Sequence, residues 1–181
     1  MRTRRFTCTV VALAALAAGC GDAAASEDAV AWTNQVCTAL SGFTRAASTG
    51  PRVDSADPVA TVQGVRDYLR ATSEELQRSL TALDAVGPSP VAGGDQYVTR
   101  LEEALRGIHT GFESARTQLR TVDTADPQAL ATAFPAAVAP LQELRDLPDP
   151  TEGLGEGDEL RVAAEQAAAC RELRSAAAPT G

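Results

Sequence analysis

The sequence contains no lysine, one histidine and few aromatic residues, and each shortage narrows the functions to consider. All 16 basic residues are arginine, and aromatic residues make up only 4% of the chain. A zinc site normally draws on several His and Cys ligands, so one histidine gives little basis for such a site. Few aromatic side chains and no glycine-rich phosphate loop argue against nucleotide and nucleic-acid binding. We therefore expect no metal, no cofactor and no nucleic-acid partner.

Motifs for nucleophilic catalysis are also missing. The chain has no G-x-S-x-G turn, which would expose an activated serine. His109 follows Ile108 at the edge of an apolar stripe, where a partly exposed structural histidine is the simpler interpretation. The acidic run over residues 146–159 lacks the D-x-D-x-D-G spacing of a calcium loop. We expect no enzymatic activity.

The first 19 residues have the pattern of a secretion signal. Three arginines within the first five residues precede an apolar run over residues 10–18. That run is too short to span a bilayer, which takes about 20 apolar residues, but it is typical of a signal peptide. The run ends in LAAGC (residues 16–20), which resembles the bacterial lipobox. The resemblance implies removal of residues 1–19 and attachment of a diacylglycerol to Cys20.

Residues 20–26 then form a lipidated tether. A flexible chain of about 6 residues reaches on the order of 14 Å, so the folded part would lie close to the outer face of the cell membrane. After Cys20 the chain has 13 arginines against all 24 acidic residues, a net charge near −11. Anionic lipids repel such a chain, so the acyl chains must supply the anchoring.

Two cysteines remain outside the signal and the anchor, Cys37 and Cys170. Leftover cysteine pairs in exported chains usually form disulfides. Closing a loop of more than 100 residues stabilises a fold by about 5 kcal/mol in the chain-entropy model. The alternative, a reactive dithiol, has no C-x-x-C spacing to support it, and we predict a structural Cys37–Cys170 bond.

Helical periodicity predicts four main helices. They cover residues 27–47, the stretch from Asp57-Pro58 to the break at Gly87, residues 95–122, and residues 158–177. The third is the clearest, because its apolar positions recur in steps of three and four and Asp95 can cap its start. Those positions are Val98, Leu101, Leu105, Ile108, Phe112, Ala115, Leu119 and Val122.

A fifth helical segment starts at Asp126-Pro127 and contains Pro135 and Pro140. Each proline removes a backbone donor, so we expect this segment to be kinked or interrupted and to end by Pro148. No strand-like alternation occurs. The sequence therefore predicts an all-α, up-and-down bundle of four main helices plus a proline-interrupted helix. It forms one domain over residues 27–177, and residues 178–181 are a tail.

After the lipobox, Trp32, Val36 and Cys37 open the first helix, and Cys170 lies near the C-terminus. This layout resembles the small secreted lipoproteins of actinobacteria. The absence of lysine and the abundance of alanine are typical of a GC-rich genome. That family has no established activity, so the resemblance implies a helical extracytoplasmic lipoprotein and nothing catalytic.

Two functional hypotheses remain. The first is a lipid-anchored bundle that acts by contact with a partner protein or a cell-envelope component. The alternative is a ligand-binding lipoprotein with a small apolar pocket inside the bundle, beside Gly107, Gly111 and the bend from Pro135 to Pro140. Gly107, His109 and Gly111 are the candidate contact residues, although G-x-x-x-G spacing also fits simple close packing of helices.

Overall fold

The computed structural model describes residues 25–54, 56–126, 128, 130–132, 134–135, 139 and 158–177. The helices are α1 (Glu27–Thr49), α2 (Pro58–Asp84), α3 (Gly94–Arg120), α5 (Asp158–Gln166) and α6 (Ala168–Ala177). No strand occurs in this part of the chain. The prediction of an all-α helical bundle is confirmed.

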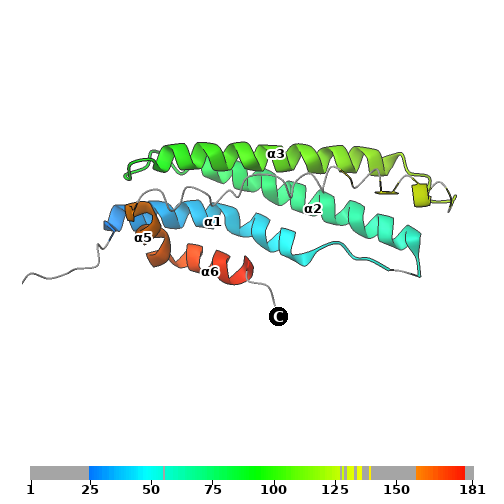
Figure 1. The fold of residues 1–181 in the computed structure, drawn as a ribbon, viewed down its shortest axis with the longest axis horizontal. Coiled ribbons are helices and arrows are strands. Elements are labelled where there is room, and N and C mark those ends of the chain that lie inside the picture. The colour runs from blue at the N-terminus through cyan, green and yellow to red at the C-terminus, as the bar shows by residue number, and fades with distance from the viewer. Residues whose placement is uncertain are drawn as a thin grey trace, which may run out of the picture.

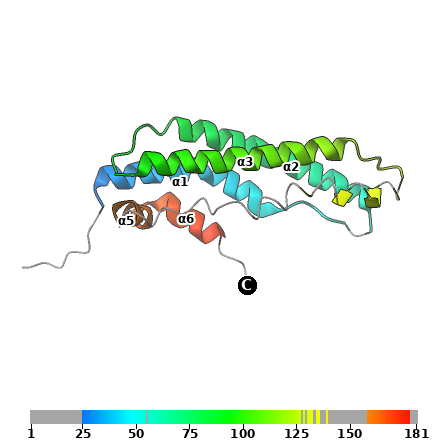
Figure 2. The same cartoon turned by 45° about the horizontal axis from the view of Figure 1, so that its top comes forward.

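The three long helices lie side by side along the length of the molecule (Figures 1 and 2). Helix α2 runs opposite to α1 and α3 runs opposite to α2, and α5 and α6 lie against α1. The main core lies where α1, α2 and α3 meet, and α5 adds Leu160 and Ala163 to it. Helix α2 has 27 residues and is about 40 Å long at 1.5 Å per residue. We call the end of the bundle where α2 begins and α3 ends the distal end, because it lies opposite the start of α1.

Side-chain caps and glycines set the ends of α1 and α2. The Ser26 hydroxyl accepts a hydrogen bond from the Ala29 N–H at 3.2 Å, and the Asp57 carboxylate accepts one from the Ala60 N–H at 2.9 Å. Pro58 occupies the first turn of α2, where its missing N–H costs nothing. Gly50 ends α1 with φ 63°, a conformation that glycine adopts without strain. The predicted start of α2 is confirmed.

Helix α3 begins differently from the prediction. Gly93, at φ 81°, precedes the helix and makes no side-chain cap. The Asp95 carboxylate instead accepts a hydrogen bond from the Ser89 N–H at 2.7 Å, across the turn that joins α2 to α3. The prediction that Asp95 caps α3 was therefore wrong, because the turn offers the carboxylate a nearby free donor.

The predicted apolar face of α3 is mostly confirmed. Its fully buried members are Leu101, Leu105, Phe112, Ala115 and Leu119. Val98 and Ile108 are only half-buried, and Tyr97 is buried instead.

A second core lies at the distal end. Residues from α2 and α3, including Val62, Leu69 and Leu119, pack there with Leu130. Asp126 begins the segment that carries Leu130, since its carboxylate accepts a hydrogen bond from the Gln128 N–H at 2.8 Å. Residues 128, 130–132, 134–135 and 139 are helical, Pro135 included. Pro140 and Pro148, and with them the predicted interruption and end of this helix, lie outside the described residues.

Three side chains tie helix ends to neighbouring elements. The Trp32 indole N–H donates to the Gly87 carbonyl oxygen at 3.1 Å, and the Tyr68 hydroxyl donates to the Ala47 carbonyl oxygen at 3.2 Å. The Arg66 guanidinium donates to the carbonyl oxygen of Leu119 in the last turn of α3, where positive charge is favourable. Each contact satisfies a carbonyl at or beyond a helix end, where intrahelical donors run out.

Candidate functional site

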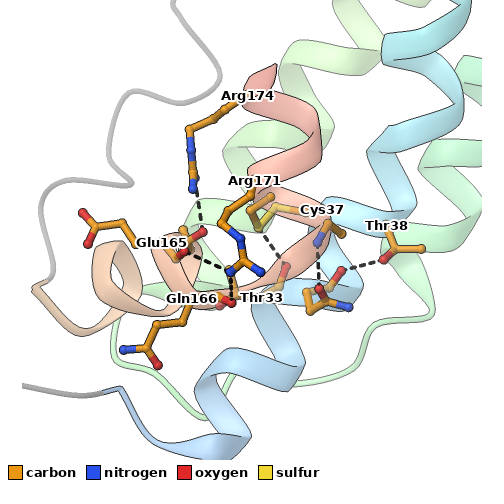
Figure 3. Close-up of a disulfide and its surroundings, with 11 residues drawn as sticks. Thr33, Cys37, Thr38, Glu165, Gln166, Arg171 and Arg174 are labelled. Carbon is orange, nitrogen blue, oxygen red and sulfur yellow. Dashed lines mark hydrogen bonds between the residues drawn. A yellow bond between two sulfur atoms is a disulfide. The ribbon is translucent and has the colours of Figure 1, made fainter. Parts of the chain in front are cut away.

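The predicted disulfide joins two elements that are far apart in sequence. Cys37, near the middle of α1, and Cys170, in the first turn of α6, form a disulfide with a Cα–Cα distance of 5.1 Å (Figure 3). Cys170 is buried at 3% exposure, whereas Cys37 is partly exposed. The Cys170 sulfur also lies 3.6 Å from the Thr33 carbonyl oxygen. The bond therefore staples the C-terminal part of the chain onto the first helix.

The last predicted helix is not continuous. Residues 158–177 form two helices, α5 and α6, which break at Ala167 and point in different directions (Figures 1 and 2). The prediction of one helix over this range was wrong. The break contains neither glycine nor proline, and Ala167 is followed by two more alanines. Alanine has the highest helix propensity, so tertiary contacts and not local sequence must impose the break.

Polar side chains satisfy the backbone groups near the break. In a continuous helix the carbonyl oxygens of Ala164, Glu165 and Gln166 would accept from the N–H groups four residues later. Here Arg174 donates to the Ala164 carbonyl oxygen at 3.1 Å, and Arg171 donates to those of Glu165 and Gln166 (Figure 3). The Ala164 carbonyl oxygen is partly buried and would be costly to leave unpaired, whereas those of the exposed residues Glu165 and Gln166 could also bond to water, so Arg174 makes the more important of these contacts.

Helix α1 supplies the matching cap for α6. The Asn34 side-chain oxygen accepts a hydrogen bond from the Ala169 N–H at 2.9 Å. Asn34 lies one turn before Cys37, so the cap and the disulfide come from the same face of α1. We name Asn34, Cys37, Cys170, Arg171 and Arg174 the disulfide junction.

An apolar pocket lies at the distal end. It has a volume of about 370 Å³ and opens between the loop after α1, the start of α2 and the segment after α3. Its apolar lining includes Val53, Pro58, Val62, Phe134 and Pro135. Its size falls in the range of small-molecule sites. We call it the distal pocket.

The candidate contact residues on α3 lie elsewhere. Gly107 is exposed, and His109 and Gly111 are half-buried. None of the three lines the distal pocket or belongs to the disulfide junction. The three candidate residues on α3 therefore lie apart from both the distal pocket and the disulfide junction. The distal pocket contains Pro135, as expected for a ligand pocket, but it does not lie beside Gly107 and Gly111.

The described residues contain no cluster of three or more His, Cys, Asp or Glu side chains suited to a metal ion. No described helix is both long enough and apolar enough to cross a membrane. Cys20, the predicted lipidation site, lies outside the described residues. Comparison with protein-family models, with curated proteins and with solved structures found no match to this chain.

Sequence reasoning missed Asn34, Arg171 and Arg174. One signal was available for Asn34, because a residue three positions before Cys37 shares its helix face and therefore faces whatever Cys37 binds. No comparable signal identified the arginines. The alanine, glutamate and arginine residues of this segment predict a continuous helix whose charged side chains face solvent.

Proposed function

We propose that this chain is a lipid-anchored extracytoplasmic lipoprotein that acts by contact with a partner protein or an envelope component, without catalysis. The supporting sequence features are the signal over residues 1–19, the lipobox ending at Cys20 and the acidic mature chain. A disulfide between Cys37 and Cys170 fits an oxidising compartment. The resemblance to small secreted lipoproteins of actinobacteria supports the same proposal.

The observation that carries the contact function is exposed apolar surface at the distal end. Val53 is 70% exposed and Val59 is 47% exposed, and Val53 lines the rim of the distal pocket. Exposed apolar side chains next to an apolar pocket are typical of interaction surfaces. Since α2 is about 40 Å long, a chain anchored before α1 would present this surface well away from the membrane.

Photo-crosslinking in intact cells tests this contact. A photoreactive residue at position 53, in the chain with Cys20 intact, should give one reproducible adduct. The same residue at position 77, which is exposed on the middle of α2, should not. The Val59→Asp substitution should abolish the adduct at position 53 because it places a charge in the contact. Equal labelling at both positions would contradict the proposal.

The distal pocket favours a second candidate function, the binding of a small apolar ligand. Thr61 is the main polar group of the lining besides Asp54, and its hydroxyl both donates to the Asp54 carbonyl oxygen and accepts from the Asp54 N–H. With that hydroxyl engaged, the pocket suits an apolar molecule. Native mass spectrometry of the purified protein should then show a bound small molecule. Ala131→Trp, at an exposed lining position, should remove it and leave the crosslink at position 53 intact.

A further inference from the structure

The break at Ala167 is a conflict between local sequence and tertiary structure. The segment from Ala163 to Cys170 reads AAEQAAAC and favours a continuous helix. A continuous helix would also keep one buried stripe, since Leu160, Ala163, Ala167 and Cys170 recur at helical spacing. A straight helix over residues 158–177 is therefore a competing conformation with a similar apolar face.

Two specific contacts from α1 favour the bent form. One is the disulfide from Cys37 to Cys170, and the other is the hydrogen bond from the Ala169 N–H to Asn34. In a straight helix the same N–H would donate to the Glu165 carbonyl oxygen, which now accepts from Arg171. The Ala169 N–H therefore has a hydrogen-bond partner in both forms, Asn34 in the bent form and Glu165 in the straight one. The disulfide has no such replacement in the straight form.

Helix α5 buries more apolar side chains than α6, although both helices lie against α1. It places Leu160 and Ala163 in the main core at 3% and 0% exposure. Among residues 171–176 of α6, only Leu173 is even half-buried. Apart from Cys170, no side chain among residues 168–176 of α6 is fully buried, so the disulfide is the main side-chain contact that holds α6 on α1.

We propose that the disulfide junction is a redox-dependent conformational switch, in which reduction lets α5 and α6 merge into one straight helix. The reductant is a dithiol, either a small molecule or a protein with a reduced cysteine pair. Its thiolate attacks the more exposed sulfur, that of Cys37, and the Cys170 thiolate leaves and takes up a proton. The second thiol of the reductant then displaces Cys37. The protein gains two thiols, and the reductant becomes a disulfide.

The switch changes the surface of α1. In the oxidised form a small apolar patch that contains Val30 and Cys37 is covered by Ala164 of α5, Ala167 at the break and Cys170 of α6. If α5 remains in the core, straightening carries α6 away from α1 and exposes the part of this patch that Cys170 covers, around Cys37. Oxidised and reduced chains would then present different faces of α1 to a partner.

NMR of the complete chain in detergent micelles, with and without dithiothreitol, tests the switch. Residual dipolar couplings should fit two helix axes for residues 158–166 and 168–177 in the oxidised protein. After reduction they should fit one axis, and the carbon chemical shifts of residue 167 should become helical. A Cys37→Ser/Cys170→Ser chain without reductant should match the reduced protein.

Ala168→Pro is the matched control. Proline is tolerated at the first position of α6 but not inside a straight helix, so this variant should keep two axes after reduction. The proposal is overturned if the reduced wild-type chain keeps two axes, because packing alone then sets the bend. It is also overturned if residues 168–177 lose their helical shifts, or if reduced Ala168→Pro gives a single axis.

Discussion

The side-chain oxygen of Asn34 accepts a hydrogen bond at 2.9 Å from the backbone N–H of Ala169, a residue 135 positions later in the chain. The first turn of α6 is thus capped by a residue of α1. The disulfide between Cys37 and Cys170 lies beside this cap. One face of α1 therefore determines both where α6 begins and where it lies.

Removing the cap should destabilise the fold modestly. We expect Asn34→Ala to lower the free energy of unfolding by about 1 kcal/mol, the usual effect of losing an N-cap side chain. Asn34→Asp should recover most of the loss, because a carboxylate also accepts from the Ala169 N–H and is favoured at a helix N-terminus. Urea unfolding followed by circular dichroism measures both. A stability for Asn34→Ala equal to wild type would show that the cap is not formed.

Two helical glycines should respond oppositely to alanine. A Cβ at Gly64 would lie 2.4 Å from the backbone carbonyl oxygen of Arg52, so Gly64→Ala must push the loop before α2 away and destabilise the protein. A Cβ at Gly42 would meet the carboxylate end of Glu75 at 2.7 Å, and this partly exposed, flexible side chain can move together with its partner Arg78. Gly42→Ala should therefore stabilise by up to about 1 kcal/mol through helix propensity. If Gly64→Ala also raises the urea midpoint, the loop does not pack on α2 as described.

The single tryptophan, Trp32, should stabilise the fold through its indole N–H as well as through the size of its ring. Trp32→Phe keeps an aromatic ring in the core but leaves the Gly87 carbonyl oxygen without the indole donor. We expect a loss of about 1–2 kcal/mol, because the oxygen is left without its partner and the smaller ring packs less well. Far-UV circular dichroism is the appropriate probe, since the variant has no tryptophan fluorescence. No change in the thermal midpoint would contradict the contact with the turn.

Glu113 should contribute to stability in a pH-dependent way. Burial raises the pKa of its carboxyl, but hydrogen bonds from Ser73 and Arg116, with the positive charges of Arg116 and His109, outweigh this and leave the pKa below its ordinary value. A lowered folded pKa means that the stabilisation is present above the ordinary carboxyl range. It is lost as pH falls through the folded value. The stability gap between wild type and Glu113→Gln should therefore close in acid.

The hydroxyl of Ser73 can be tested separately at the same site. It donates to the Glu113 carboxylate at 2.7 Å across α2 and α3, so Ser73→Ala should raise the Glu113 pKa in a carbon-detected NMR titration. Ser114→Ala, on the exposed side of α3, is the control and should leave that titration unchanged. An unaltered Glu113 pKa in Ser73→Ala would show that the Ser73 hydroxyl does not stabilise the Glu113 carboxylate.

Local signals were enough to predict much of the fold. Asp57-Pro58 sets the start of α2 through backbone geometry that depends on neighbouring residues alone. The face of α3 followed from spacing, and the disulfide from the two cysteines that remain outside the predicted signal and anchor. These features need no knowledge of the tertiary arrangement.

The remaining features depend on contacts between distant segments. Ala167 separates α5 from α6 at a place where α1 contacts Cys170 and the Ala169 N–H, and helix propensity cannot reveal such contacts. Asp95 caps a turn in place of its own helix because Ser89 lies nearby in space. The distal pocket likewise forms from segments around Val53, Pro58 and Phe134, which are separate in sequence.

The measurement that tests the account most directly is the intact mass of the protein isolated from its native membrane, before and after reduction. The account predicts residues 20–181 carrying acyl chains on Cys20, with a gain of two hydrogens when the Cys37–Cys170 bond is reduced. An unacylated chain recovered free in the medium would contradict the lipid anchor. A mass that does not change on reduction would contradict the Cys37–Cys170 disulfide.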